Sequence, residues 1–446
     1  MDSGSDFIFH RKIGRTYPVA AGGSGAEIVG EDGRQYLDAA GGVFVAIVGH
    51  GVSEIAEAIS EQLRSLNFAY TGDFTTSAEQ RLAEKLIAIA PPGFAKVWLT
   101  TSGSTANEAA LKLARQYHHL RGASQKSKIV SRWHSYHGST MGALSMSGAV
   151  PRRQLYTPYL IDFPHVAAPN CYRCPLGRSP ADCDTACAEE IGATMRLHGA
   201  DYISAFIVEP VAGGPLGALP TTPAYLQAAR RFCDENDALL IVDEVVSGVG
   251  RTGDWFGVQE SGVVPDIITL GKGLGGGYTP IGAVLVHERV HAAFESSGTP
   301  FLHGESFTGH STMAAAGYAT LSYIERHGLL GRVREMGERL AGRMQELSNL
   351  PIVGDVRGRG LLQGIELVRD RRSNAPFARA AQVAERVVAA AAERGVLLLA
   401  GNAGVDGVDG DTVVVAPPYI VSAEQVDRIV DTLSDALRTV PADSEA

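Results

Sequence analysis

Short apolar runs alternate with helical stretches through the middle third of the chain. The apolar runs span 96–101, 128–130, 205–208, 239–242, 267–270 and 282–286. Short apolar runs bounded by turn residues are typical of strands buried in a parallel sheet. The stretch 107–119 has the spacing of an amphipathic helix. This alternation predicts an α/β core with helices on both faces of one sheet.

The two flanks of this core carry different patterns. Short strand-like patterns surround Asp32 and Gly41, and 53–66 has helical spacing. Amphipathic and strand-like runs alternate near the other end, at 321–347, 361–367, 380–394 and 412–416. We therefore expect an N-terminal segment (1–53) that contributes to a small domain, a large domain (54–318) and a C-terminal small α+β domain (319–446).

Polar residues follow five of the apolar runs. They are the segment 102–105, the segment 136–138, Glu209, Asp243 with Glu244, and Lys272. An open α/β sheet binds its ligands at the carboxyl ends of its strands. We expect these residues to lie along one edge of the sheet and to form a site there.

Asp243 and Lys272 suit a pyridine aldehyde cofactor. The carboxylate can keep the ring nitrogen protonated, and the amine can form an imine with the aldehyde carbon. The glycines on both sides of Lys272 allow a cofactor to approach the backbone closely, and Val246 would pack against the ring. Alone, each charged residue could equally be a solvated lysine or a carboxylate that caps a loop. Together they predict an enzyme that uses pyridoxal phosphate.

Two further segments contain residues that could contact the phosphate and the ring of such a cofactor. Hydroxyl and backbone N–H groups at the start of a helix favour a phosphate, and the residues in that place are Ser102, Gly103, Ser104 and Thr105. The same residues could serve only as a helix N-cap. Tyr136 could stack on the pyridine ring, although an isolated tyrosine is equally a core or rim residue.

A substrate carboxylate needs a cation. Arg357 could clamp it through a bidentate fork. Glu209 is the expected partner of Arg357 when no carboxylate is bound, which would let the pocket alternate between two substrates. A solvated ion pair is the alternative for both residues.

The composition narrows the classes of partner. Of the 446 residues, 45% are hydrophobic and 20% are charged, which describes an ordered globular protein. The formal net charge of -10 argues against nucleic acid, and no basic block suggests a membrane surface. No apolar run approaches the length of a membrane span. The first residues lack the pattern of a secretory signal, so we expect a cytoplasmic protein.

Four of the five cysteines crowd into one segment, at Cys171, Cys174, Cys183 and Cys187. Their spacing suits a structural tetrathiolate zinc or iron–sulfur site, and a cytosolic location disfavours disulfides. Spacing alone does not give tetrahedral geometry, so metal-bound and metal-free interpretations stay open.

Together, these motifs resemble those of the class III, omega-amino-acid-type, pyridoxal-phosphate-dependent aminotransferases of fold type I, over nearly the whole chain. In this resemblance the segment 243–253 binds the cofactor ring, the segment 269–280 contains the Schiff-base lysine, and the segment 102–108 is the phosphate loop. The segment 136–138, with Tyr136 and His137, provides the stacking aromatic residue. The segment 208–210 is the carboxylate gate, and the segment 356–361 is the carboxylate-binding segment. The segment 303–310 resembles the loop through which a neighbouring subunit reaches the phosphate; it contains Thr308, and Ser306 stands where the family commonly has threonine. Phe44 matches a position that often lines the substrate pocket.

The resemblance implies a large domain with a mostly parallel seven-stranded sheet and a smaller α+β domain built from both termini. It implies transfer of an amino group from an amine or an (omega-)amino acid to a keto acid such as pyruvate or 2-oxoglutarate, through an imine on Lys272 and a pyridoxamine phosphate intermediate. It also implies a homodimer with shared active sites, with a tetramer left open. Many members that handle 2-oxoglutarate have glutamine in place of Val246, which leaves the acceptor open. Some relatives carry a cysteine-bound cluster near the dimer interface.

Other functions share part of this pattern. A racemase, decarboxylase, phospholyase or aminomutase of the same fold would use every cofactor residue named above. The run 239–244 imitates the metal-holding strand of a P-loop ATPase, but the chain contains no G-x-x-x-x-G-K-[ST] motif. The segments 248–253 and 271–276 match the G-x-G-x-x-G of a dinucleotide-dependent oxidoreductase, but neither opens a convincing helix.

Overall fold

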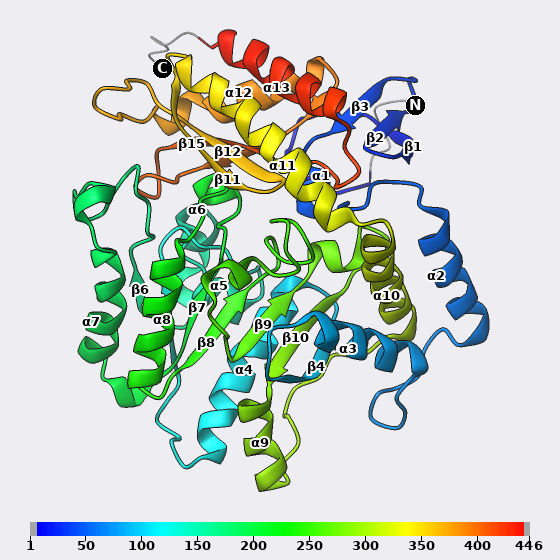
Figure 1. Cartoon of the computed structure of the whole chain (residues 1–446), viewed down its shortest axis with the longest axis vertical. Helices are drawn as coiled ribbons and strands as arrows, with labels where there is room; N and C mark the ends of the chain where they lie inside the picture. Colours follow the sequence, from blue (N-terminus) through cyan, green and yellow to red (C-terminus); the bar gives the residue numbers. More distant parts are fainter. Residues whose placement is uncertain (1–6, 441–446) are drawn as a thin grey trace.

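A seven-stranded sheet forms the centre of the molecule (Figure 1), whose computed structural model describes residues 7–440. The strand order is β4-β10-β9-β8-β7-β5-β6. The bounds are β4 (Phe94–Thr100), β5 (Lys128–Arg132), β6 (His165–Val166), β7 (Ile203–Val208), β8 (Leu239–Asp243), β9 (Ile267–Leu270) and β10 (Gly282–His287). Only β10 runs antiparallel to its neighbours in this sheet. The predicted, mostly parallel α/β sheet is confirmed.

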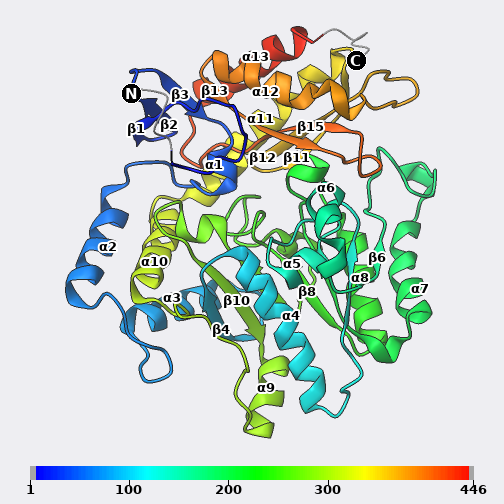
Figure 2. The ribbon, with the colours of Figure 1, turned by 180° about the vertical axis from the view of Figure 1, so that it is seen from behind.

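The central strands are apolar because both of their faces are covered. Ala205, Ile207 and Ile241 belong to a hydrophobic cluster that includes residues of α4 (Gly103–Leu120) and α9 (Glu288–Ser297). Phe206 and Leu240 belong to a cluster on the opposite side. Helices packed there include α3 (Ser77–Ile89), α7 (Glu189–Leu197), α8 (Pro223–Glu235) and α10 (Ser311–Arg326). Figures 1 and 2 show the two layers from opposite sides.

Two smaller sheets lie beyond the carboxyl ends of these strands. One has the order β1-β2-β3-β13, and the other, all antiparallel, has the order β11-β12-β15-β14. Their bounds are β1 (Ala20–Ser24), β2 (Glu27–Gly30), β3 (Gln35–Asp38), β13 (Val396–Leu397), β11 (Val353–Arg359), β12 (Leu362–Leu367), β14 (Leu399–Asn402) and β15 (Asp411–Val415). Because β3 pairs with β13, segments near the two ends of the chain build one α+β unit.

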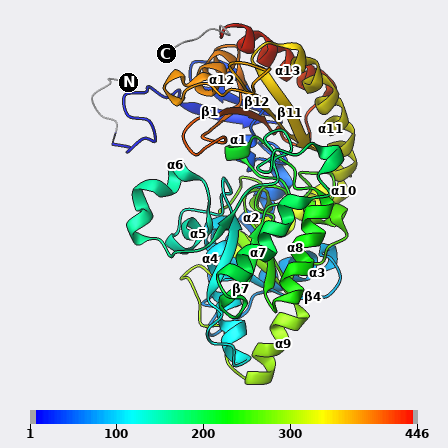
Figure 3. The same ribbon diagram turned by 90° about the vertical axis from the view of Figure 1, so that its left-hand side faces the viewer.

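The remaining helices cover these sheets or connect the parts. Helices α11 (Leu329–Glu346), α12 (Val383–Glu393) and α13 (Ala423–Arg438) lie over the smaller sheets, as Figure 3 shows. The connecting helices are α1 (Gly41–Phe44), α2 (Ser53–Ser65), α5 (Met141–Met146) and α6 (Val150–Arg153). Within residues 7–440 we find no helix with the length and apolarity that a membrane crossing requires.

Element boundaries differ from the sequence pattern in one place that matters for the domains. The predicted amphipathic stretch 321–347 consists of the end of α10 and the whole of α11, which are separated at Gly328 with a φ of 60°. Glycine adopts this left-handed conformation without steric cost. The domain boundaries at residues 53 and 318 stay predictions, and α10 runs across the second of them.

A buried arginine ties the loop after β8 to the smaller sheets. Arg251 is fully buried, and its Nη1 donates to the carbonyl oxygens of Leu361, at 3.1 Å, and Pro417, at 2.6 Å. Its guanidinium carbon lies 4.8 Å from the ring centroid of Tyr419. Burial lowers the pKa of this guanidinium. Arg251 therefore bonds across the boundary between the large sheet and the smaller ones.

We expect Arg251→Leu to destabilise the protein by about 2–4 kcal/mol, because two buried carbonyl groups lose their donor. The midpoint of thermal unfolding, measured by calorimetry, should fall. Arg64→Leu removes an exposed arginine from α2 and should leave the midpoint nearly unchanged. Equal midpoints for the wild type and the Arg251 variant would contradict this role.

Candidate active site

The carboxyl ends of the large-sheet strands surround a cavity of about 180 Å³. Its lining consists of Ser102, Gly103, Ser104, Asn107, Tyr136, His137, Gly138, Glu209, Asp243, Val245, Val246 and Lys272. Larger cavities, of about 480 and 800 Å³, lie elsewhere, around Trp98 and Lys112. The structure thus brings together most of the polar residues expected at this edge of the sheet.

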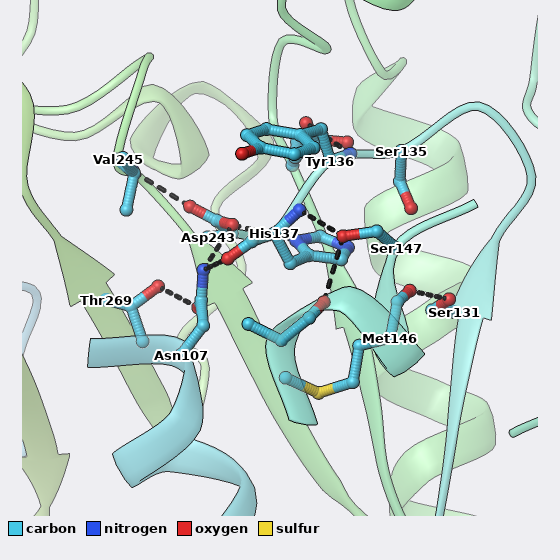
Figure 4. A network of polar contacts seen from close by, with 12 residues as sticks. Asn107, Ser131, Ser135, Tyr136, His137, Met146, Ser147, Asp243, Val245 and Thr269 are labelled. Carbon is cyan, nitrogen blue, oxygen red and sulfur yellow. Dashed lines mark hydrogen bonds and ion pairs between the residues drawn. The ribbon is translucent and has the colours of Figure 1, made fainter. Parts of the chain in front are cut away.

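The carboxylate of Asp243 is buried at the end of β8 and is fixed through both oxygens (Figure 4). Its Oδ2 lies 2.7 Å from Nδ1 of His137 and accepts a 2.8 Å hydrogen bond from Nδ2 of Asn107. Its Oδ1 accepts from the backbone N–H of Val245 at 3.0 Å. A buried carboxylate held by several donors keeps one orientation.

Asn107 was missed in the sequence, although it lies inside the predicted phosphate segment. Its Nδ2 also donates to the carbonyl oxygen of His137 at 2.7 Å, and its Oδ1 accepts from Oγ1 of Thr269 at 2.7 Å. It therefore links α4, β8 and β9 (Figure 4). The signal for it was its place one turn into a helix whose start was already assigned to the site.

His137 was predicted to contact the cofactor, and its Nδ1 faces Asp243. Its side chain is buried, and its backbone N–H donates to Oγ of Ser147 at 2.8 Å. Oγ of Ser147 in turn donates to the carbonyl oxygen of Ala143. These contacts hold His137 against Asp243, and its contact with the cofactor stays a prediction.

Lys272 follows β9 and shares the cavity with Asp243. Burial lowers the pKa of its amine to about 8; Asp243 and Glu209 oppose this shift, and Arg152 adds to it. A lysine with a lowered pKa is uncharged more often near neutral pH and is then a nucleophile. Its Nζ lies 5.3 Å from the ring centroid of Phe44.

Glycines allow the strand ends to approach the start of α4. A Cβ on Gly271 would lie 2.9 Å from the backbone of Gly103, and a Cβ on Gly103 would lie 2.7 Å from Val245. Neither contact is tolerable for a real side chain. The close approach places the backbone N–H groups of the first turn of α4 at the cavity.

Ser102 and Thr105 form the helix N-cap that the sequence allowed. Oγ of Ser102 accepts from the N–H of Thr105 at 3.2 Å, and Oγ1 of Thr105 accepts from the N–H of Ser102 at 3.0 Å. Thr105 is absent from the cavity lining, whereas Gly103 and Ser104 belong to it. A phosphate at this helix N-terminus is compatible with the cap, because the cap leaves other N–H groups free.

Tyr136, Val246 and Phe44 supply the aromatic and apolar surfaces of the site. Tyr136 lines the cavity, and its hydroxyl lies 2.7 Å from Oγ of Ser139. Phe44 is buried in a cluster against which Val246 and Leu399 pack. Phe44 comes from the N-terminal segment, so the small α+β unit also contributes to the surroundings of Lys272.

The predicted pair of Glu209 with Arg357 is wrong. Glu209 is buried against Arg132, whose Nη2 lies 3.4 Å from Oε2 of Glu209 and donates to its carbonyl oxygen at 3.0 Å. Burial raises the pKa of Glu209. Arg132 is itself only 2% exposed, so the two charges offset each other inside the protein.

Arg357 has other partners and does not line the cavity. Its Nη1 donates to carboxylate oxygens of Asp355 and Glu366, each at 2.8 Å. Its Nη2 donates to the carbonyl oxygen of Leu216 at 2.7 Å, and Nε points at the same oxygen. Since all three nitrogens are engaged, the expected carboxylate clamp has no free face, and Arg357 holds β11 to β12 and to the segment after β7.

Ser306 and Thr308 lie away from the cavity of this chain. Ser306 is exposed, and Thr308 is buried with its Oγ1 accepting from the N–H of Glu305 at 3.0 Å. Their expected contact with a phosphate would need the neighbouring subunit, and it stays a prediction.

The cysteine segment shows no metal centre. Among residues 7–440 we find no group of three or more Cys, His, Asp or Glu side chains that could hold a metal ion. Cys171 is exposed, whereas Cys187 is buried in the hydrophobic core. Burial, aided by the other thiols, raises the pKa of Cys187 to about 11. The metal-bound interpretation therefore finds no support in the geometry.

Comparison with known proteins decides the family, because a family model described as "Aminotransferase class-III" matches residues 10–437. The chain belongs to the class-III aminotransferases. It is 37% identical to a taurine–pyruvate aminotransferase of Rhodobacter capsulatus, over 89% of this chain and 85% of that protein. It is 35% identical to a diaminobutyrate–2-oxoglutarate transaminase of Halomonas elongata, over 95% and 90%. The solved structure of an (S)-enantioselective omega-transaminase from Thermomicrobium roseum has a TM-score of 0.89 and 31% identity, covering 95% of this chain and 93% of that one.

As a class-III aminotransferase, the protein is an enzyme that transfers amino groups and uses pyridoxal phosphate. The cavity residues fit this cofactor. They include a carboxylate fixed through both oxygens, an amine of lowered pKa, a glycine-packed helix N-terminus and an aromatic ring. The ATPase and oxidoreductase interpretations are thereby excluded.

The lowered pKa of Lys272 predicts the stability of the cofactor-free protein. Its pKa is about 8 when folded and 10.5 when unfolded, so between these values the unfolded chain holds a proton that the folded chain lacks. Stability therefore rises with pH over this window and is reduced below it. We expect Lys272→Met to stabilise the cofactor-free protein at pH 7 by about 2–3 kcal/mol.

Urea unfolding of the cofactor-free wild type and variant at several pH values would measure this difference. The advantage of the variant should shrink between pH 8 and pH 10.5. Lys96→Met, at an exposed lysine, should change stability little at any pH. A constant difference between wild type and Lys272→Met across this window would contradict the lowered pKa.

Proposed function

We propose that the chain moves the amino group of an amine or an omega-amino acid to a keto acid, with Lys272 and Asp243 as its catalytic residues. The observation that carries this proposal is their shared cavity, in which the carboxylate is fixed and the amine has a lowered pKa. Pyridoxal phosphate, when bound, supplies an aldehyde that reacts with amines and a ring that accepts electrons.

Asp243 would keep the cofactor's ring nitrogen protonated. Because His137 and Asn107 occupy Oδ2, the carboxylate cannot rotate and presents a fixed negative charge to the cavity. Lys272 would take the proton from the substrate carbon and return it in the next step, because its amine is both nearby and readily uncharged.

The remaining cavity residues would bind and orient the cofactor. The backbone N–H groups of Gly103 and Ser104 suit the phosphate, together with the hydroxyls of Ser102 and Thr105 and, from a neighbouring subunit, Ser306 and Thr308. Tyr136 and Val246 would cover the ring. Two similar enzymes are named for pyruvate and for 2-oxoglutarate as acceptors, and we propose a keto acid of this kind here.

A homodimer would complete the site. Large apolar side chains are exposed, among them Tyr70, Phe74, Tyr159, Leu302 and Phe307. Exposed aromatic residues are typical of protein interfaces. A tetramer and a cytoplasmic location stay predictions from the sequence.

The central test is substitution of the two catalytic residues in the purified holoenzyme. Lys272→Ala should lose the visible absorbance of the bound cofactor and slow amino transfer by at least about 10²–10⁴-fold, because the proton carrier is gone. Asp243→Asn should retain cofactor but also lose most of its rate. Spectra and turnover with a panel of amines and keto acids would measure both effects.

Lys96→Ala is the matched control, because Lys96 is an exposed lysine on β4. It should keep both absorbance and rate. Full activity of Lys272→Ala would overturn the proposed function.

A further inference from the structure

Substrate carboxylates need a cation that is free to receive them, and the arginines near the site differ in this respect. Arg132 is buried against Glu209, and Arg357 is bonded to Asp355 and Glu366. Arg152 is exposed, and among residues 7–440 no carboxylate lies within ion-pair distance of it. A guanidinium without a partner, beside a cavity that receives amino acids, is a candidate for substrate recognition.

Arg152 lies directly over the ring of Tyr136. Its guanidinium carbon is 4.9 Å from the ring centroid, within the range of a cation–π contact. Tyr136 lines the cavity, and its hydroxyl lies 2.7 Å from Oγ of Ser139. Arg152 therefore lies against a residue of the cavity wall, although its own side chain does not line the cavity.

The charge of Arg152 acts inside the cavity. Burial is the main cause of the lowered pKa of Lys272, and Arg152 adds to it, which agrees with the position of the guanidinium beside Tyr136. A carboxylate beside Tyr136 would meet the positive charge of Arg152. The field therefore favours anionic groups at this end of the cavity.

Arg152 lies in a short helix that packs against a loop of the smaller unit. Helix α6 contains Pro151 in its first turn, and the N–H of Arg152 donates to the carbonyl oxygen of Ala149 at 3.0 Å. A Cβ on Gly407 would lie 2.8 Å from Val150, so the loop between β14 and β15 packs onto α6. The helix thus stands where the large sheet and the smaller sheets meet (Figures 1 and 3).

An apolar cluster also lies beside the site. Phe44 is buried in one cluster, and Val246 and Leu399 pack against it. A Cβ on Gly213 would meet only Val246 and Phe44, both beyond 3.5 Å. This side can receive the hydrocarbon part of a substrate but offers nothing to an anion.

We propose that Arg152 binds the substrate carboxylate and thereby sets the preference of the enzyme for omega-amino acids and keto acids over simple amines. This inference rests on the proposed function and names the residue that selects its substrate class. The guanidinium can receive a carboxylate through two parallel N–H···O bonds while it stays stacked on Tyr136.

The test compares two donors that differ only in the carboxylate, 4-aminobutanoate and 1-aminobutane, in the donor half-reaction of the holoenzyme without keto acid, followed by the spectral change of the cofactor. In Arg152→Leu, the concentration of 4-aminobutanoate that gives half the limiting rate should rise by about 10–100-fold. This is the effect expected when a charge-assisted, hydrogen-bonded pair is lost. The limiting rate should change little. The value for 1-aminobutane should stay within about twofold of the wild type.

Two controls separate charge from structure. Arg152→Lys should recover part of the lost affinity, because a lysine keeps the charge without the fork. Arg196→Leu, at an exposed arginine on α7, should leave both donors unaffected. Equal changes for the two donors in Arg152→Leu, or no change for either, would overturn the proposal.

Calorimetric titration with butanoate tests the same residue without turnover. The wild-type holoenzyme should bind butanoate, and Arg152→Leu should bind it about tenfold or more weakly. Equal affinities, or no binding by the wild type, would also overturn the proposal. A wild type that binds butanoate but transfers no amino group from any donor would instead count against the proposed function.

Discussion

The site depends on one buried carboxylate that cannot turn. Removing a charge from water is costly unless hydrogen bonds replace the lost solvation. For Asp243 these bonds come from His137, Asn107 and the backbone of Val245, which lie on three different segments. The same bonds that make the charge tolerable also fix its direction. Lys272 then faces a permanent negative charge in a cavity where its own charge is disfavoured.

This arrangement requires the strand ends and the start of α4 to approach more closely than side chains allow. Gly271 and Gly103 make the approach possible, and it brings helix N–H groups to the same small cavity as the two charges. The smaller unit contributes Phe44 from one end of the chain, and Arg251 bonds the loop after β8 to segments beside β12 and β15. The cavity and the contacts with the smaller unit therefore lie at the same edge of the large sheet.

The strands, their polar ends and the shared position of Asp243 and Lys272 could be predicted because periodicity and strand-end position are local properties of the sequence. The partners of the ion pairs could not be predicted, because the sequence does not show which of the many carboxylates the fold brings to each arginine. Arg357 was expected to face Glu209, but its Nη1 bonds to Glu366 of the neighbouring strand β12, and β5 brings Arg132 to Glu209 instead. Asn107 was missed because its function depends on which face of α4 points to β8. The cysteine spacing fitted a metal site, but the exposure of Cys171 and the burial of Cys187 are tertiary properties.

The central claim is that Lys272 is the residue that carries pyridoxal phosphate. Reduction of the holoenzyme with borohydride makes the link between cofactor and lysine permanent, and mass spectrometry of the digested protein then locates it. The account predicts a phosphopyridoxyl group on the peptide that contains Lys272 and on no other lysine. A label on a different lysine, or a holoenzyme whose Lys272 peptide stays unmodified, would contradict it.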